Sequence, residues 1–307
     1  MGAGPPVKGA VKGRIAPPPI AAGRSLTAWA SGGFLALIAV AALLAPLVAH
    51  WLEVDLEAVD LLNRLKPPSA THPLGTDELG RDLLLRLLDG GRVSLAVGLS
   101  TALLAGAIGT AVGLVAGYLG GRLDAALMRG ADAVIALPLL PLLIVLAALD
   151  PAKLGLPARD EWSGALDVMR IVVIVGLVGW TTVARLVRGA TMSLKAQPFV
   201  EAARAQGAGP LRIMARHILP NLTTPILVAV TLAVGNVILL ESVLSFLGLG
   251  IQPPRASWGA MLTGAQELVT TAPLQAVVPG LAIFMTVVAV NLLGEALQEA
   301  LDPRARR

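Results

Sequence analysis

The 307-residue chain contains no cysteine, few aromatic residues (3%) and few charged residues (14%). Without cysteine, disulfides and thiolate metal sites are excluded. Soluble globular domains carry about 25% charged residues. A chain with so little charge and with 55% hydrophobic residues is therefore predicted to be a membrane protein with several spans.

Motifs for several chemistries are also missing. The chain has no G-x-x-x-x-G-K-[ST] motif for binding a nucleotide and no H-E-x-x-H motif for a metalloprotease. Its three histidines, His50, His72 and His217, are scattered along the sequence. No cluster of carboxylates lies within a predicted span, which argues against proton-driven secondary transport. A transporter whose energy comes from another chain survives this elimination.

Several apolar stretches are long enough to cross a bilayer, which takes about 20 helical residues. These stretches are residues 28–51, 93–118, 127–149, 170–188, 222–248 and 276–294. The third contains Pro138 and Pro141, which membrane helices tolerate because neighbouring helices satisfy the freed backbone groups. The sequence therefore predicts an all-α polytopic membrane protein with six transmembrane helices.

The distribution of basic residues predicts the orientation. With the N-terminus in the cytoplasm, the inside segments hold 15 lysines and arginines and the outside segments hold 8. An excess of these residues on the cytoplasmic side orients helical membrane proteins, so both termini are predicted to be cytoplasmic. This bias also explains the pI near 10 without a nucleic acid partner. Residues 1–27 are predicted to form a disordered, basic cytoplasmic tail.

The first outside segment, residues 52–92, is predicted to contain an amphipathic helix over residues 76–89. Thr76 is a suitable N-cap, Asp77 complements the positive end of a helix, and Gly90-Gly91 would end it. The leucines of this segment fall on one face, which would pack on the bundle or on the membrane surface. A direct role in substrate handling is the alternative.

Two residues in and after the fifth predicted span are singled out. Glu241 lies inside the span, where burial of a carboxylate costs roughly a few kcal/mol or more, so it should face the bundle interior or a wet cavity. It is either a pathway or gate residue, or a structural carboxylate that is held by serine or backbone donors or neutral by protonation. Trp258, in the outside segment 250–275, is predicted to lie at the membrane interface.

Segment 189–221 is too polar to span the membrane and too basic to lie outside, so it is predicted to be a cytoplasmic loop. Strong helix formers lead up to Gly207, which can adopt the left-handed conformation that ends a helix. A second helix is predicted from Leu211 to Ile218, before Leu219-Pro220 redirects the chain into the fifth span. Small alanines would let another surface approach closely. The alternative is a basic loop that touches anionic lipid headgroups.

Glu201-Ala-Ala-x-x-x-Gly207, followed by Ile218-Leu-Pro220, resembles the EAA loop of ABC-importer permeases, although His217 stands where many such loops carry isoleucine. Further segments resemble the C-type permease subunit of dipeptide/oligopeptide importers. These segments are His72-Pro-Leu-Gly-Thr-Asp-Glu-Leu-Gly-Arg-Asp82, residues 245–250, 252–254, 257–262, 291–297 and 301–304. The resemblance covers residues 28–304.

The resemblance implies a six-helix permease of the type I ABC importer kind in the cytoplasmic membrane of a bacterium or archaeon. The implied partners are a homologous second permease subunit, two cytoplasmic ATPase subunits, an extracytoplasmic substrate-binding protein and membrane lipid, with no nucleic acid. The chain would be no enzyme and bind no cofactor, because ATP and Mg belong to the ATPase subunits. The coupling loop that docks on an ATPase subunit would contain Glu201, Ala202, Ala203, Gly207, Leu219 and Pro220.

The expected function is to form half of the pathway for di- or oligopeptides, with residues 93–304 as the permease core. A permease for nickel, glutathione or another small solute is the alternative within the class, because these importers use very similar subunits. A stand-alone secondary transporter or channel would predict intramembrane ionisable pairs. A membrane-anchored scaffold would leave the inside loop unexplained.

Overall fold

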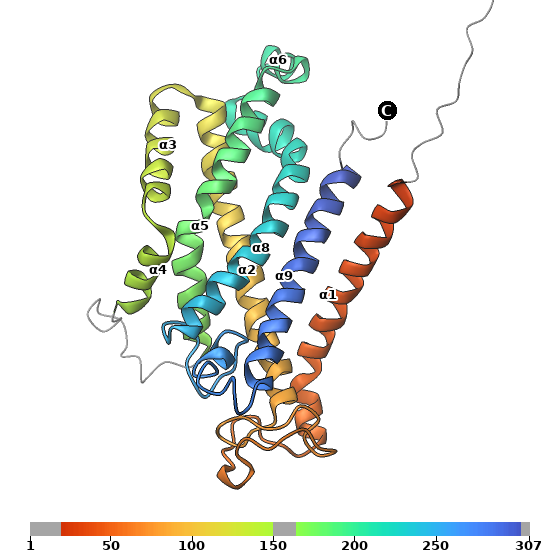
Figure 1. Ribbon diagram of the computed structural model, residues 1–307. Coiled ribbons are helices and arrows are strands. Elements are labelled where there is room, and N and C mark those ends of the chain that lie inside the picture. Colours follow the sequence, from red (N-terminus) through yellow and green to blue (C-terminus); the bar gives the residue numbers. More distant parts are fainter. Residues whose placement is uncertain (1–19, 150–163, 302–307) are drawn as a thin grey trace, which may run out of the picture.

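The computed structural model describes residues 20–149 and 164–301 of the chain. In these ranges every named element of secondary structure is a helix. The long helices lie side by side as one bundle (Figure 1). They are α1 (Ile20–Trp51), α2 (Leu83–Leu119), α5 (Gly164–Lys195), α8 (Thr223–Phe246) and α9 (Leu274–Leu301). All five are long and apolar enough to cross a membrane. The predicted all-α membrane fold is confirmed.

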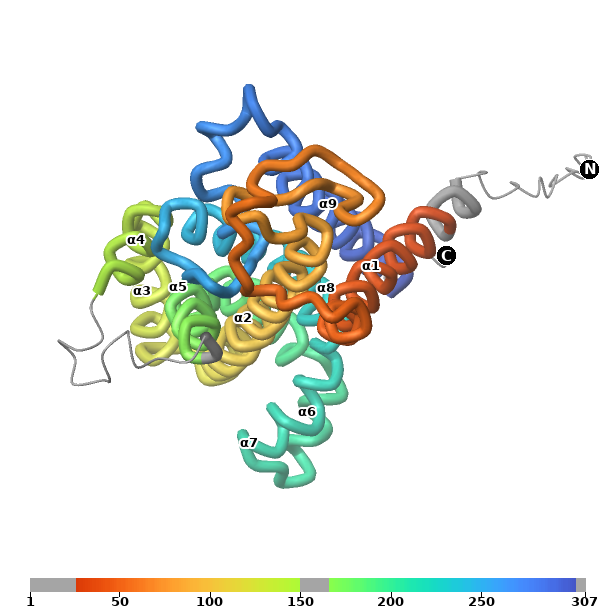
Figure 2. The backbone as a smooth tube through the Cα atoms, turned by 90° about the horizontal axis from the view of Figure 1, so that it is seen from below, coloured from red at the N-terminus to blue at the C-terminus, as the bar shows by residue number. Residues whose placement is uncertain are grey.

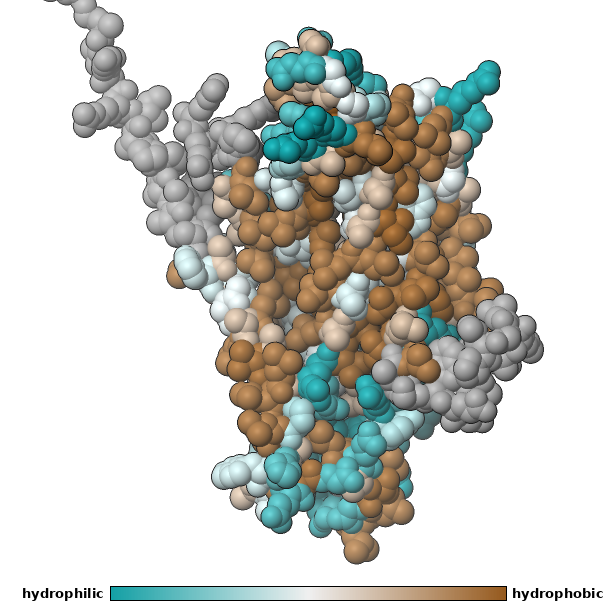
Figure 3. Space-filling model, turned by 180° about the vertical axis from the view of Figure 1, so that it is seen from behind, coloured by the Kyte–Doolittle hydropathy of each residue, from teal (hydrophilic) through white to brown (hydrophobic). Residues whose placement is uncertain are grey.

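The bundle has two unlike ends. At one end, which we call the loop end, lie residues 52–82 and 247–273; at the other, which we call the α6 end, the short helix α6 (Pro198–Ala205) protrudes (Figure 1). Seen from the loop end, α6 and α7 (Pro210–Ile213) project to one side of the bundle (Figure 2). Between the two polar ends, the face in Figure 3 is covered mostly by hydrophobic residues, as a membrane-spanning surface requires.

The predicted third span is broken. Helices α3 (Gly121–Ala136) and α4 (Leu139–Ala148) meet at an angle of 87°, so the total of six spans holds only if this bent pair counts as one. The break follows from Pro138. Leu137 precedes it and has φ −80° and ψ 135°, the extended backbone that a residue before proline prefers.

The predicted tail of residues 1–27 also needs correction at its end. Helix α1 begins at Ile20, because alanines favour helix and no proline follows position 19 until Pro46. Residues 1–19 lie outside the described ranges.

The predicted helix over residues 76–89 was wrong at both ends. Helix α2 begins at Leu83, where the Asp82 carboxylate accepts a hydrogen bond of 2.9 Å from the backbone N–H of Leu85. Gly90 and Gly91 lie within α2 and do not stop it. A Cβ at Gly90 would lie 3.2 Å from the carbonyl carbon of Ser257, so this glycine serves close packing. The amphipathic pattern belongs to the first turns of the second span.

Helices α2 and α5 pack backbone against backbone. A Cβ at Gly109, Gly113 or Gly117 would lie 2.6, 2.4 or 2.7 Å from a carbonyl oxygen of α5. The spacing of four residues places these glycines on one side of α2. Small residues at such a seam let membrane helices gain van der Waals contact, which drives their association in lipid.

Candidate coupling surface

The polar segment between α5 and α8 folds into a short helix and a tight turn. Helix α6 ends in a Schellman motif: the N–H of Ala208 donates to the carbonyl of Ala203 (3.1 Å), and that of Gly207 donates to the carbonyl of Arg204 (3.0 Å). Gly207 has φ 81°, so its predicted left-handed conformation is confirmed. The turn brings α7 back against α6.

Helix α6 has one buried and one exposed face. Val200 (0% exposed) and Ala203 (7%) pack in a hydrophobic cluster with Ile213 and Ile218 from the following turns and with Leu114 from α2. Glu201 and Ala202 are exposed on the other face. The helix is therefore fixed to the bundle by one side, and its other side is exposed.

The chain after α7 does not turn away at Leu219-Pro220, and this prediction was wrong. A π-helical turn (Met214–Ile218) and a 3₁₀ turn (Leu219–Leu222) join α7 to α8 in one helical path, Pro210–Phe246. Pro220 lies in the first turn of the 3₁₀ segment, where its missing N–H is tolerated. Pro220 is exposed and Leu219 is partly buried. Both lie in the 3₁₀ turn and not in α6, so they are at most neighbours of the exposed face of α6.

Only two residues connect α5 to α6, so the two helices are joined by a short link. At the end of α5, the Lys195 ammonium donates to the backbone carbonyl of Tyr118 (2.5 Å) and lies 5.4 Å from the centre of the Tyr118 ring. Tyr118 belongs to α2, so this contact and the glycine seam join α2 and α5 next to α6.

Glu241 lies towards the loop end of α8 and is 0% exposed. Its Oε1 accepts a hydrogen bond from Ser245 (2.7 Å), and its Oε2 accepts one from Ser94 of α2 (3.2 Å). Both serine oxygens also accept backbone N–H groups, Ser94 from Trp258 (3.1 Å) and Ser245 from Ile251 (3.0 Å). The carboxylate thus joins α2, α8 and the loop after α8. This geometry favours the structural interpretation over the pathway or gate interpretation.

Trp258 is buried inside the protein, so the prediction that its ring lies in the headgroup region was wrong. Its side chain is 2% exposed, and its indole N–H donates to the carbonyl of Leu87 (2.9 Å). The ring lies against α2 where Gly91 leaves room, since a Cβ there would be 3.1 Å from Trp258 Cζ2. With its polar group satisfied inside the protein, the ring does not need the headgroup region.

A model of the family described as "binding-protein-dependent transport system inner membrane component" matches residues 109–307, which include α6, Glu241 and α9. The chain belongs to this family. It is a permease subunit of an ABC importer in the inner membrane. Permeases of this family contain the transmembrane part, and the ATPase activity lies in separate subunits.

Three relatives illustrate the range of the family. The permease is 38% identical over 275 residues to the nickel transport system permease protein NikC of Escherichia coli (strain K12), covering 90% of this chain and 94% of NikC. It is 42% identical over 273 residues to the glutathione transport system permease protein GsiD of Escherichia coli O157:H7 (89% and 85%). It is 39% identical over 257 residues to a candidate peptide permease of Brucella suis biovar 1 (strain 1330) (83% and 80%).

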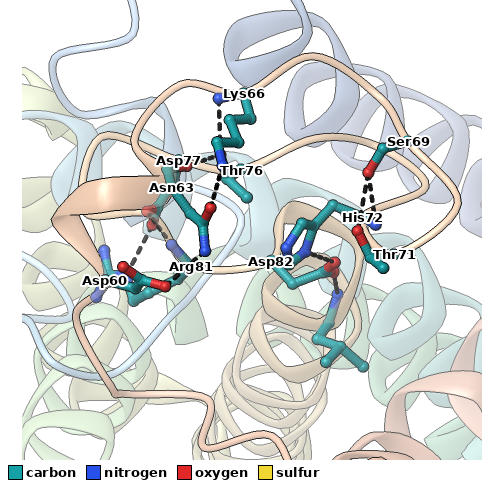
Figure 4. Close-up of polar contacts among 11 residues, drawn as sticks. Asp60, Asn63, Lys66, Ser69, Thr71, His72, Thr76, Asp77, Arg81 and Asp82 are labelled. Carbon is teal, nitrogen blue, oxygen red and sulfur yellow. Dashed lines mark hydrogen bonds and ion pairs between the residues drawn. The ribbon is translucent and has the colours of Figure 1, made fainter.

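At the loop end of the permease, polar contacts connect side chains between Asp60 and Asp82, among them Asp77 (Figure 4). Its Oδ2 lies 2.8 Å from Nε of Arg81 and 3.3 Å from Nε of Arg86. Next to this cluster, Nδ1 of His72 lies 3.0 Å from Oδ2 of Asp82. From the sequence, Asp77 was expected only to complement the positive end of a helix, whereas its carboxylate pairs with Arg81 and Arg86. The motif His72–Asp82 around it was the available signal.

Sequence reasoning also missed two ion pairs between α3 and α5. Arg188 donates from Nε and Nη2 to the two carboxylate oxygens of Asp124, at 2.5 and 2.7 Å. Arg185 Nη2 lies 2.5 Å from Asp132 Oδ1. The basic residues were counted only as loop charges. Their spacing of three residues on α5 was a usable signal, because it places both on neighbouring positions of one helix face.

Proposed function

We propose that this permease subunit forms half of the translocation pathway of an importer for di- or oligopeptides. The segment His72–Asp82, with its buried Asp77 cluster, resembles the C-type permeases of such importers. One of the three relatives above is named for peptides. The names of the other two, for nickel and for glutathione, keep nickel, glutathione or another small solute as the alternative substrate.

We further propose that the α6 end is cytoplasmic and that α6 docks on an ATPase subunit. The observation that carries this proposal is the division of α6 into an anchored face and a free face, with Gly207 holding the turn at φ 81°. Glu201 would position the surface through polar contacts, and Ala202 would permit close packing. Ala203 would pack α6 on the bundle, and Leu219 and Pro220 would border the surface.

The proposed mechanism is mechanical. ATP binding closes the pair of ATPase subunits, and the docked α6 moves with them. The displacement passes through the short link into α5 and through Lys195 and the glycine seam into α2, and the pathway changes from inward-facing to outward-facing as a rigid-body transition. This chain makes no covalent change in any molecule. A second permease subunit and a binding protein on the outer side complete the importer.

The coupling proposal is tested with Ala202→Leu. Ala202 is exposed, so a larger side chain leaves the fold of the subunit unchanged but should block a closely packed partner. The matched control is Ala36→Leu, an exposed alanine in α1. We expect Ala202→Leu to lose ATPase subunits on co-purification and to lose substrate-stimulated ATP hydrolysis, whereas Ala36→Leu keeps both. Full coupling in Ala202→Leu would refute the docking assignment.

Orientation and substrate have separate tests. A cysteine at position 202 should react with an impermeant maleimide only after the cells are opened; labelling of intact cells would place α6 outside and end the coupling proposal. For the substrate, the complete importer is reconstituted in vesicles, and the uptake of labelled dipeptide, glutathione or nickel is measured. Uptake of nickel or glutathione without uptake of the dipeptide would decide for the alternative.

A further inference from the structure

The guanidinium of Arg86, in the first turn of α2, is buried but poorly bonded. Its side chain is 9% exposed, and its one ion pair is the contact of 3.3 Å between Nε and Oδ2 of Asp77. That oxygen already accepts Nε of Arg81 at 2.8 Å, and the other oxygen of Asp77 accepts two backbone N–H groups. Within the described ranges, the side chain of Arg86 makes no hydrogen bond.

Such a side chain calls for an explanation. A guanidinium has five N–H donors, and burying a charge is costly unless it is paired and hydrogen-bonded. The large majority of buried polar side-chain atoms have a partner. Asp77 offers one negative charge to two arginines, so one positive charge at this place stays uncompensated.

Arg86 lines a cavity of about 230 Å³ at the loop end. Sites that enclose a drug-sized ligand measure about 300–1,000 Å³, so this cavity suits a smaller solute. The neutral polar side chains of Thr263 and Gln275 also line it, and both already donate to backbone carbonyls. Its apolar lining consists of Leu79, Leu83, Pro253, Ala260 and Met261.

Glu78 supplies the opposite charge in the same cavity. It is half-buried, and in the part of the chain that the structure describes its carboxylate has no ion pair and no hydrogen bond. Its Oε1 lies where Gly264 leaves room, 3.3 Å from the position of an added Cβ. Since Asp77 and Arg81 pair with each other, the lining charges that lack a close partner are those of Arg86 and Glu78. They are complementary to a ligand with one carboxylate and one ammonium group.

We propose that this cavity binds a small zwitterionic solute, with its carboxylate on Arg86 and its ammonium group on Glu78. A guanidinium can bind a carboxylate through two parallel hydrogen bonds, which gives Arg86 the partner that Asp77 does not supply. The inference rests on the proposed function, because it names the chemistry that a peptide importer would recognise at this subunit. A dipeptide carries both groups, and a bare metal ion carries neither. In the proposed orientation, the solute reaches the cavity from the outer side.

The test measures binding to the membrane complex of the two permease subunits and the two ATPase subunits. The binding protein is left out, since it would capture the solute itself. The labelled probes are alanyl-alanine, its C-terminal amide and its N-acetyl derivative. We expect the amide and the N-acetyl derivative each to bind at least about tenfold more weakly than the free dipeptide, because each leaves one buried charge unpaired.

The substitution Arg86→Gln should weaken binding of the free dipeptide by about tenfold or more. It should also abolish the difference between the dipeptide and its amide, because both changes remove the same contact. Arg92→Gln is the matched control: Arg92 lies on the same helix, is 42% exposed and is not among the lining residues of this cavity, so binding should stay at the wild-type level. If Arg86→Gln does not assemble, Glu78→Gln replaces it and should abolish the difference between the dipeptide and its N-acetyl derivative.

Equal binding of all probes to the wild-type complex would overturn the proposal. So would a variant that still distinguishes the free dipeptide from the derivative that lacks the matching group. The uptake assay separates this result from the proposed function. Uptake of dipeptide by the complete importer without binding to its membrane complex would refute the cavity assignment alone. Binding that depends on Arg86, in an importer that takes up only another solute, would refute the peptide assignment and support the cavity.

Discussion

Replacing Gly207 with valine is expected to impair transport while leaving the subunit inserted in the membrane. Gly207 has φ 81°, and a Cβ added there meets no heavy atom within 4 Å. The effect is therefore backbone strain and not a clash. A left-handed conformation costs an L-residue about 1–2 kcal/mol, and a β-branched side chain is among the least tolerant.

This strain acts on the coupling surface directly. The Schellman hydrogen bonds from Gly207 and Ala208 hold the end of α6 only while residue 207 stays left-handed. A penalty of about 2 kcal/mol reduces the population of the native turn relative to alternatives by about 30-fold. Helix α6 would then lose the fixed position on the bundle that Val200 and Ala203 give it, and motion of an ATPase subunit would no longer reach α5.

The assay compares transport and ATP hydrolysis by the reconstituted importer carrying Gly207→Val or Gly209→Val. Gly209 is a matched control, since it lies in the same turn and in open space but has φ −71° and ψ 163°, which valine adopts readily. We expect transport to fall about tenfold or more in Gly207→Val and to stay near the wild-type rate in Gly209→Val. Wild-type transport by Gly207→Val, or equal losses in both variants, would refute the reasoning.

Three further substitutions test the packing. Glu241→Ala removes the acceptor of two buried serine hydroxyls and should destabilise the purified complex by about 3 kcal/mol, measured as a lower Tm; Glu241→Gln should lose less, and an unchanged Tm for the alanine variant would contradict the assigned role. Gly113→Ala places a Cβ 2.4 Å from a carbonyl oxygen of α5 and should lower the Tm, whereas Gly130→Ala meets nothing within 4 Å and should not; equal effects would contradict the seam. Trp258→Phe removes a buried hydrogen bond and should lower the stability of the complex by about 1 kcal/mol, measured as a lower Tm. The same change at Trp51, which is 81% exposed, should leave the Tm unchanged.

Local sequence signals predicted those parts of the fold that local physics controls. The spans follow from hydropathy, and the turn after α6 follows from a glycine placed after a run of helix formers. The start of α2 could not be predicted in this way, because Thr76 and Asp82 are both good caps. The Thr76 hydroxyl is not free to cap a helix, because it accepts the N–H of Lys66 and donates to the carbonyl of Asn63. The Asp77 carboxylate accepts the backbone N–H groups of Leu79 and Arg81, which competes with helical hydrogen bonding in residues 76–82.

The remaining errors concern residues whose partners are distant in the sequence. Gly90 and Gly91 look like a helix stop until Ser257 and Trp258 are placed against them. Asp132 is 53 positions before its partner Arg185, and no local pattern connects the two. The role of Glu241 likewise depends on Ser94, which is 147 positions away.

The carboxylate of Glu241 would influence the proposed rigid-body transition. Because Glu241 fastens α2 to α8 and to the chain beyond it, the region around Ser94 would be the point about which α2 tilts. From Ser94 to its end at Leu119, α2 is about 38 Å long at the rise of an α-helix. A tilt of about 5° around that point sweeps the far end of α2 through about 3 Å. In the proposed transition, a small angular change would thus be enough to open or close one end of the bundle while the other end stays in place.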